Sequence, residues 1–364
     1  MNKSFYSLGL MSGTSADGVD SSIIESDGKD QIFIKYNNYD PYPSYLSDEI
    51  HKIKEKIENL DDLNKFSDEI ESVEDKLTNF HATVANKWFE KVKVDIVGFH
   101  GQTIFHNSDE KISKQIGLGQ KLSNLTKKIV VYDFRQNDLK NGGEGAPLAP
   151  IYHRLLVKML TKKKKIEVPV TILNIGGIAN ITSINKNYEM NSMDIGPGNC
   201  LIDKWIRFNS GKNFDENGNT AKSGKIDKFI LEQSLDNFYN SKTSKKKSLD
   251  TNDFDITFAR GLSLQNGAAT LTEFTADILS KKILDNDVYV CGGGRKNEFL
   301  VKSIKKKIKN KIKDIDYLGI DGSFIESQAF AYLAIRSYLK LPISFPETTG
   351  CKEPCTGGVI AKNF

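Results

Sequence analysis

The chain has 364 residues, of which 38% are hydrophobic and 27% charged, so it is expected to form a globular protein of two packed domains. Its 51 basic and 47 acidic residues leave a formal net charge of +4, too balanced to indicate a nucleic-acid partner. The N-terminus lacks the apolar core of a signal peptide, and no run approaches the ~20 apolar residues of a membrane span. A cytoplasmic protein without a membrane partner is therefore expected.

The first predicted element is a strand–turn–strand unit at the N-terminus. An apolar strand over residues 7–11 leads into small and hydroxyl residues, and a second strand follows over 19–24. Such a turn brings backbone N–H groups and hydroxyls up to a phosphate. It is neither a Walker A loop, which needs Gly-Lys-Ser/Thr, nor a Rossmann fingerprint, which needs a helix after the turn. We expect a phosphate-binding turn here, with an ordinary hairpin as the alternative.

Strands and helices alternate through the rest of the first half. A segment rich in β-formers over 31–39 precedes two amphipathic helices, in which apolar residues recur every three or four positions. Their apolar stripes cover residues 46–60 and 70–88. Strands are then expected over 95–99 and 129–133.

A glycine-rich segment over 141–147 separates the two halves of the chain. The second half repeats the strand–turn–strand pattern of the first. An apolar strand over 169–175, a glycine turn over 174–180 and a return strand over 179–184 form a second strand–turn–strand unit. Another strand follows over 188–194. This duplication indicates one phosphate-binding turn in each domain and a nucleotide in the cleft between them. A plain glycine hairpin is again the alternative.

A third glycine cluster, Gly292-Gly293-Gly294, closes a strand and precedes a helix over 297–312. Glycines let a flat ring approach the backbone, and the start of the helix adds positive potential. No acidic residue follows at the ribose-binding spacing of a dinucleotide fold, which disfavours a dinucleotide site. We expect an adenosine pocket here, with a merely tight turn between strand and helix as the alternative. The last expected helix covers 323–339, and Pro342 ends it.

The candidate general base is Asp194, at the predicted end of its strand and before a rigid Gly-Pro-Gly turn. A carboxylate held there and aimed into a cleft is well placed to accept a proton. The alternative is a capping role for Asp194 on the helix expected over 199–208.

Two polar clusters follow predicted strands, at 99–103 and 133–138. Gln and Asn side chains suit sugar hydroxyls or an amide, and an Arg fork suits a carboxylate. We expect substrate contacts here, with a purely structural network as the alternative. The candidate residues are His100, Gln102, Arg135 and Asp138.

The four cysteines, Cys200, Cys291, Cys351 and Cys355, are far apart except for the last two. A single Cys-x3-Cys without a second pair is a poor zinc signal, so reduced thiols are expected and no residue is assigned to a metal.

Several longer motifs together resemble the anhydro-N-acetylmuramic acid kinase family, in the family's order and from Gly9 to Ile360. The motifs are GLMSGTSADGVD, GFHGQTIFH, DFRQNDLKNGGEGAPLAP, LNIGGIANIT, MDIGPGN, ARGLSLQNGAATLTEFTA, CGGG and ESQAFAYLA. The resemblance implies an α/β fold of the actin/hexokinase/Hsp70 superfold, with two domains, each a mixed sheet flanked by helices, and the active site in the interdomain cleft. It implies ATP and Mg²⁺ as cofactors, and conversion of 1,6-anhydro-N-acetylmuramic acid to its 6-phosphate in cell-wall recycling.

Site residues follow from the resemblance position by position. Asp194 matches the catalytic aspartate, which would deprotonate a water molecule, and Glu326 matches a glutamate facing the sugar. Ile195 and Ala16 depart mildly from the family pattern, and neither is a reacting group. The residues expected to bind the nucleotide are Gly13, Thr14, Ser15, Ala16, Asp17, Gly18, Val19, Asp20, Asn174, Gly176, Gly177, Asn180, Gly292, Gly293, Gly294 and Asn297.

The expected domains are residues 1–135 with 343–364, and residues 136–342. The expected partner is a small-molecule sugar, and a homodimer is left open because nothing in the sequence decides the oligomeric state. Two other functions remain. One is a kinase for another sugar or a small acid, in which the aspartate would deprotonate a substrate hydroxyl. The other is an Hsp70- or actin-like nucleotide switch, disfavoured because no added domain follows residue 358.

Overall fold

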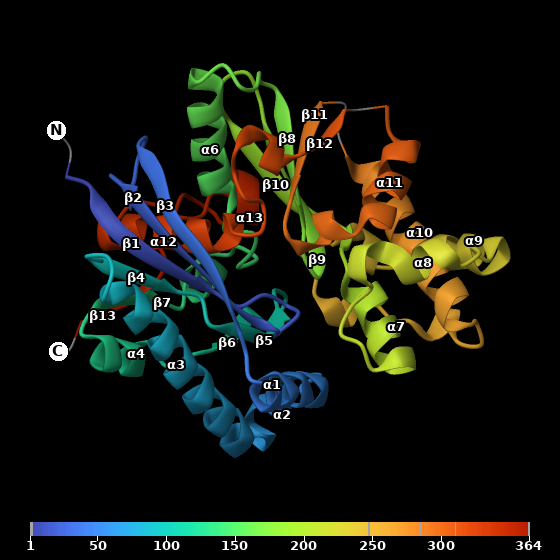
Figure 1. The fold of residues 1–364 in the computed structure, drawn as a ribbon, viewed down its shortest axis with the longest axis horizontal. Coiled ribbons are helices and arrows are strands. Elements are labelled where there is room, and N and C mark those ends of the chain that lie inside the picture. The colour runs from blue at the N-terminus through green and yellow to red at the C-terminus, as the bar shows by residue number, and fades with distance from the viewer. Residues whose placement is uncertain (1–2, 247, 284–285, 310, 363–364) are drawn as a thin grey trace. The chain divides into compact units, whose positions relative to one another are not determined.

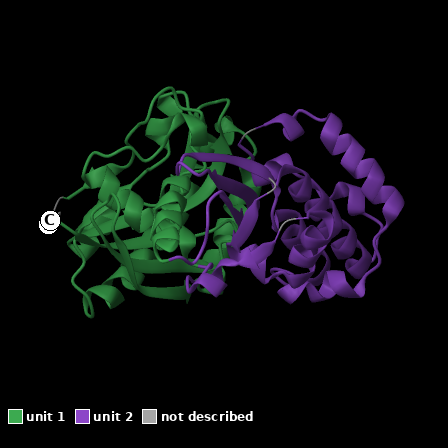
Figure 2. Ribbon diagram, turned by 90° about the horizontal axis from the view of Figure 1, so that it is seen from above, with its two compact units in different colours: residues 1–163, 324–364 green, residues 164–323 purple. Residues whose placement is uncertain are grey.

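The computed structural model describes residues 3–246, 248–283, 286–309 and 311–362. The chain forms two compact units, residues 1–163 with 324–364 and residues 164–323 (Figure 2). The domain borders expected from the sequence were at 135/136 and 342/343, whereas the two units meet at 163/164 and 323/324. The difference arises because the helices at 150–162 and 325–338 pack within the first unit, which we call unit 1.

A six-stranded mixed sheet organises the described part of unit 1, in the order β13-β7-β4-β1-β2-β3 (Figure 1). Three antiparallel strands at one side continue into parallel pairs of β1 with β4 and β4 with β7. Two further strands, β5 and β6, form a separate hairpin. The strand bounds are β1 Phe5–Met11, β2 Gly18–Ser26, β3 Ile32–Pro41, β4 Ile96–Phe99, β5 Gln102–Asn107, β6 Ile112–Ile116, β7 Ile129–Tyr132 and β13 Val359–Ala361.

Helices cover both faces of this sheet. Leu8 and Leu10 point into a core shared with the first and third helices, whereas Gly9 faces the opposite side, as strand alternation requires. A Cβ on Gly9 would lie 1.9 Å from Ser327 O, so glycine lets α12 lie directly on β1. The helix bounds are α1 Ser44–Lys56, α2 Leu60–Lys65, α3 Ser67–Phe89, α4 Gly119–Thr126, α5 Gln136–Lys140, α6 Pro150–Lys162, α12 Ile325–Tyr338 and α13 Pro346–Thr349.

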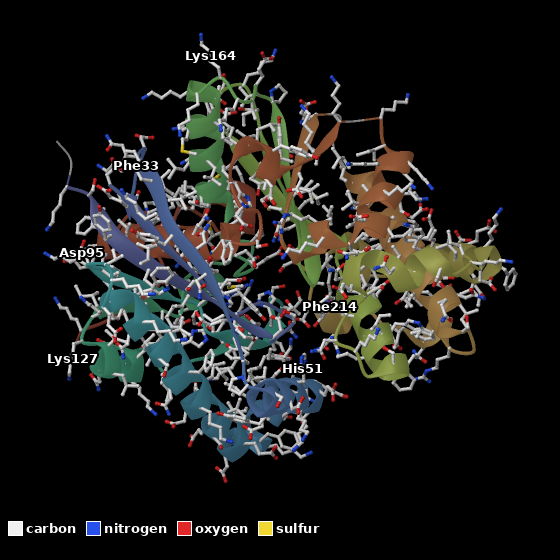
Figure 3. The ribbon with its side chains drawn as sticks, viewed as in Figure 1. Phe33, His51, Asp95, Lys127, Lys164 and Phe214 are labelled. Atoms are coloured by element: carbon white, nitrogen blue, oxygen red, sulfur yellow. The ribbon has the colours of Figure 1, made fainter. Side chains whose placement is uncertain are left out.

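The beginnings of β1 and β4 are tied together by Asp95, labelled in Figure 3. Its Oδ2 accepts from the Tyr6 backbone N at 2.9 Å, and its own backbone N donates to Tyr6 O at 2.8 Å. This pair fixes the register of the parallel strands, so the polar segments that follow them begin at the same edge of the sheet.

The described part of residues 164–323, which we call unit 2, repeats this plan. Its sheet has the order β10-β9-β8-β11-β12, with an antiparallel meander of three strands followed by parallel pairs. Gly267 lets α10 approach α7, since a Cβ there would lie 2.2 Å from the Trp205 ring. The bounds are β8 Val170–Ile175, β9 Ile178–Ile184, β10 Met190–Pro197, β11 Asp287–Cys291, β12 Ile312–Asp314, α7 Cys200–Ser210, α8 Asn219–Ser223, α9 Lys228–Asn240, α10 Leu264–Lys282 and α11 Glu298–Lys307. Short 3₁₀ helices lie at Glu216–Gly218, Thr243–Lys245, Thr251–Asp253, Thr257–Ala259, Gly293–Lys296 and Ile315–Leu318.

The expected α/β class with mixed sheets flanked by helices, and the repeated strand–turn–strand unit, are confirmed. Two helix boundaries were wrong. The first helix ends at Lys56, because Asn59 caps a new helix and Asp62 completes its capping box. The helix expected to reach residue 312 ends at Lys307, and Ile312 begins β12. In the described residues no helix has the length and apolarity needed to cross a membrane.

Candidate active-site residues

The turn between β1 and β2 is held in a defined shape by neighbouring polar groups. Ser12 Oγ donates to Gln102 Oε1 at 2.6 Å, and Gln102 Nε2 donates to Gly13 O at 3.1 Å. Ala16 has φ +49°, and its N–H bonds back to Gly13 O. The exposed Thr14 and Ser15 form the tip, and a Cβ on Gly13 would meet no atom within 4 Å. Gln102, expected as a substrate residue, thus positions this turn.

His100 and Arg135, from two different strand ends, meet in unit 1. His100 Nδ1 donates to Gly101 O at 2.8 Å, which leaves Nε2 to accept from Arg135 Nη2 at 3.1 Å. Burial, and to a smaller extent the Arg135 charge, lowers the pKa of His100 to about 3. The imidazole is therefore neutral at physiological pH. It accepts a hydrogen bond from the Arg135 guanidinium and orients it without placing a second positive charge beside it.

Asp138 lies in the same segment on α5 but is 1% exposed. Its Oδ2 accepts from Gly145 N at 2.7 Å and its Oδ1 from Thr349 Oγ1 at 2.6 Å. These bonds connect α5 to the glycine-rich loop and to the C-terminal segment. Its substrate role stays a prediction.

A cleft of about 700 Å³ lies within unit 1 beside His100. Asp133 lines it with its backbone in the left-handed region, at φ +53°, and burial raises the pKa of the Asp133 carboxyl. Its other polar lining residues include Lys114, Gln115, Gln120 and Gln136.

The second glycine turn and the third glycine cluster lie together in unit 2. A Cβ on Gly292 would be 2.4 Å from Asn174 Oδ1, and one on Gly294 would be 2.3 Å from Ile175 Cγ2. The N–H groups of Gly198 and Asn199 donate to Gly177 O and Gly176 O, both at 2.8 Å. Only glycine permits these approaches. The second glycine turn and the third glycine cluster, which are far apart in the sequence, therefore pack into one region of closely spaced backbone.

Two residues at this region hold it in place. Asn297, expected to bind the nucleotide, caps α11 by accepting from Leu300 N at 3.0 Å. Arg295, which the sequence analysis missed, is 9% exposed and donates to Asp316 Oδ2 at 2.9 Å and to Asp321 Oδ1 at 3.2 Å. The sequence signal that could have identified Arg295 is its position directly after the three glycines, together with the acidic residues at 314, 316 and 321 that it pairs with. Arg295 thereby fixes the loop that carries the glycine cluster.

Asp194 lies inside β10, three residues before the strand ends at Pro197, and not at the strand end as expected. The register shifts between Asp194 and Gly196, so a β-bulge sets the direction of the side chain. The carboxylate is 8% exposed, and its Oδ2 accepts from Leu249 N at 2.9 Å. The capping alternative is not what the structure shows, because α7 has no side-chain cap. Asn180 is its cross-strand partner in β9.

Glu326 occupies the first turn of α12 in unit 1 and is half-buried. Acidic side chains are favoured at this end of a helix, because the exposed N–H groups there carry partial positive charge. Asp194 belongs to unit 2.

Comparison with known proteins identifies a full-length similarity. A family model described as anhydro-N-acetylmuramic acid kinase matches residues 5–363. A protein of that name from Pelagibacter ubique is 50% identical over 379 aligned positions, which cover 100% of both chains. Another, from Rhizorhabdus wittichii, is 39% identical over 97% of each. Among solved structures, a ROK family glucokinase from Streptomyces griseus, in complex with glucose and AMPPNP, gives a TM-score of 0.40 at 13% identity, over 90% of this chain and 99% of that one.

Proposed function

The chain belongs to the anhydro-N-acetylmuramic acid kinase family, and we propose that it uses ATP to convert 1,6-anhydro-N-acetylmuramic acid to N-acetylmuramic acid 6-phosphate. The observation that carries this proposal is the family match over residues 5–363. It is supported by a relative that is 50% identical along the whole chain. The product would return cell-wall sugar to metabolism. We assign the reaction to the cytoplasm, where ATP is available.

The chemistry explains why a buried carboxylate is needed. The substrate has no free 6-hydroxyl, because O6 is bonded to C1. Water attacks C1, the C1–O6 bond breaks, and O6 takes the γ-phosphoryl group of ATP, leaving ADP. Asp194 accepts the proton of that water, and Glu326 orients the water. The N–H of Leu249 donates to Oδ2 of Asp194 at 2.9 Å and so holds the carboxylate that acts as the base.

The glycine segments would bind the nucleotide. The turn at 12–17 offers backbone N–H groups and the exposed hydroxyl of Thr14 for phosphate oxygens, whereas the Ser15 hydroxyl donates to Asp17 Oδ1 at 2.7 Å. In unit 2, the close approach of Gly292–Gly294 to residues 174–175 supports a site in which adenosine lies against bare backbone. Mg²⁺ bound to the phosphates would neutralise their charge, and the carboxylates of Asp17 and Asp20 are hard oxygen donors of the kind it prefers.

Arg135 is our candidate for the lactyl carboxylate that distinguishes the muramic sugar. Arg135 Nη2 lies 3.1 Å from His100 Nε2, and Nη1 donates to Gly145 O at 3.4 Å, so these two contacts hold the guanidinium plane. A guanidinium held in a fixed plane is suited to donating two parallel hydrogen bonds to a carboxylate. Gln102 and Asp138 act in this proposal by holding the turn at 12–17 and the loop at 143–145.

A panel of sugars tests the function. ATP consumption is measured with 1,6-anhydro-N-acetylmuramic acid, 1,6-anhydro-N-acetylglucosamine, N-acetylmuramic acid, N-acetylglucosamine and glucose. We expect turnover with the anhydro-muramic sugar to exceed the others, with a product whose mass equals that of the substrate plus one phosphoryl group (HPO₃) and one water. Preference for an open sugar would indicate an ordinary sugar kinase. ATP hydrolysis unaffected by every sugar would indicate a nucleotide switch.

A further inference from the structure

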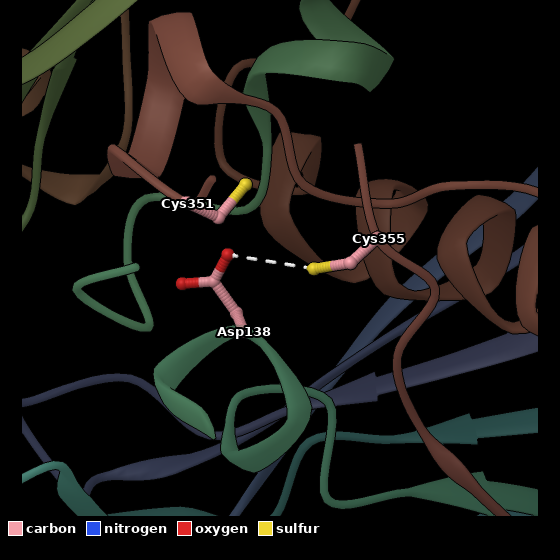
Figure 4. Close-up of side chains that lie close together, drawn as sticks. All are labelled: Asp138, Cys351 and Cys355. Carbon is pink, nitrogen blue, oxygen red and sulfur yellow. Dashed lines mark hydrogen bonds between the residues drawn. The ribbon is translucent and has the colours of Figure 1, made fainter. Parts of the chain in front are cut away.

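Three residues that could bind a metal ion meet inside unit 1, next to the glycine-rich loop at 143–145. Asp138 on α5 lies beside Cys351 and Cys355 of the C-terminal segment (Figure 4). One ligand atom from each lies within 4.8 Å of the others, and all three residues are buried. Ligand atoms of a tetrahedral site lie about 3.3–3.8 Å apart, because each is about 2.0–2.3 Å from the ion. Cys355 Sγ is already 3.9 Å from Asp138 Oδ1, so small side-chain movements would bring the three atoms to that spacing.

Within the described part of the chain, the Asp138 carboxylate has no cationic partner. It is 1% exposed, and its described donors are the Gly145 N–H, the Thr349 hydroxyl and, at 3.9 Å, the Cys355 thiol, all neutral. Among the ion pairs of the described residues, none includes Asp138. Buried charges in proteins are normally paired with an opposite charge or bound to a metal. A cation between Asp138 and the thiols would supply that charge.

The two thiols are the soft ligands that such a site needs. Cys351 is 2% exposed and Cys355 is 9% exposed, and both are free. Cys355 Sγ lies 3.0 Å from Ser344 Oγ, and Cys351 Sγ donates to Glu353 O at 3.2 Å. A thiol binds a metal ion as its thiolate, so uptake of the ion releases the thiol protons and depends on pH.

The backbone holds these side chains in place before any ion binds. Ile343 N donates to Cys355 O at 2.9 Å, and Cys355 N donates to Ser344 O at 3.1 Å, so the loop is closed at its base. Lys352 N donates to Asn141 O at 3.1 Å, which fixes the loop tip to the segment after α5. Pre-organisation of this kind reduces the conformational entropy lost on binding.

We propose that Asp138, Cys351 and Cys355 form a binding site for a thiophilic divalent cation, with Zn²⁺ as the best match. Two S–H bonds break as two Zn–S bonds form, and two protons leave to solvent, while Asp138 supplies a carboxylate oxygen. A water molecule completes the tetrahedron. The ion cross-links the C-terminal segment to α5, and it does not depend on the proposed reaction.

The test is metal binding by the reduced, metal-stripped full chain. Zn²⁺ is titrated against a chromophoric chelator, and Co²⁺ is titrated as a spectroscopic probe. We expect one tight equivalent per chain, release of two protons, and Co²⁺ absorption bands from thiolate charge transfer and tetrahedral coordination. Failure of the fully reduced wild-type chain to bind either ion above a weak background would overturn the proposal.

Matched variants locate the site. Cys351→Ser and Cys355→Ser should each lose the charge-transfer intensity and weaken Zn²⁺ binding by at least about tenfold. Asp138→Asn should weaken binding while keeping the two-thiolate spectrum. Cys200→Ser, in α7, is the control and should bind as wild type. If Cys355→Ser does not fold, Cys351→Ser together with the proton count still decides. Unchanged spectra in both C-terminal cysteine variants would contradict the assignment.

Discussion

At the scale of single residues, turnover should depend most on Asp194. Replacement by Asn keeps the shape and can still accept from the Leu249 N–H, but the amide cannot take a proton. Asp194→Asn should lower kcat by about 10²–10⁴-fold and leave the ATP dissociation constant within about twofold. Asp236→Asn, an exposed change on α9, is the control. A variant that keeps its melting temperature and turns over within about threefold of wild type would remove Asp194 from the mechanism.

Arg135 carries the second prediction at this scale. Truncating one partner of a buried Arg–carboxylate pair commonly costs about 2–5 kcal/mol of binding. Arg135→Ala should therefore raise the sugar KM strongly while the ATP KM changes little, and Arg135→Lys should recover only part of the loss because ammonium lacks the planar fork. Arg260→Ala, an exposed site in unit 2, is the control.

Steady-state kinetics and thermal unfolding on the same Arg135→Ala protein separate recognition from folding. Loss of melting temperature with both KM values raised alike would mean that Arg135 only braces the loop with His100. An unchanged sugar KM in a well-folded protein would also contradict the recognition role.

At the scale of secondary-structure elements, the helices and strands with regular apolar spacing could be predicted from the sequence. The caps and bulges that end or bend them could not. The N-terminal hairpin and α3 followed from their apolar patterns. The boundary between α1 and α2 did not, because the apolar spacing continues through Asn59, whose side chain starts a new helix. The bulge that aims Asp194 also could not be read from the chain, because it depends on the register with β9. Asp138 and Cys355 are 217 positions apart, and only the tertiary fold brings them together.

The contact between β1 and α12 makes a prediction for two glycines. Gly9→Ala would place Cβ 1.9 Å from Ser327 O, so the helix must move away from the sheet. Overpacking of this kind typically costs about 1–3 kcal/mol, and Gly9→Ala should lower the unfolding midpoint in urea accordingly. Gly13→Ala is the matched control on the same strand–turn unit, since its Cβ would meet no atom within 4 Å. Equal midpoints for the two variants would show that α12 does not rest on Gly9.

At the scale of the whole molecule, acid should destabilise the protein through buried histidines in unit 1. Burial lowers the pKa of His81 and His100 to about 3 and that of His153 to about 4. In the unfolded chain histidine titrates near 6.5, so below that pH the unfolded state binds more protons. The free energy of unfolding should therefore fall as the pH drops from about 6.5 toward 4.

Removing one of these histidines tests the sign and size of this effect. His81→Gln should make the decline shallower by about one proton, or about 1.4 kcal/mol per pH unit within that window. The measurement is the urea midpoint of wild type and variant at several pH values. Parallel pH profiles for the two proteins would contradict a neutral, buried His81.

The most direct test of the proposed reaction is the origin of the oxygen at C1. The chain is turned over briefly with ATP and the anhydro sugar in ¹⁸O-water, quenched, and the product is analysed by mass spectrometry after fragmentation. Unlabelled product held in the same water for the same time corrects for exchange of the C1 hydroxyl. We expect one ¹⁸O at C1 and none in the phosphate. Label in the phosphate, or a phosphorylated product that retains the anhydro bridge, would contradict water attack at C1.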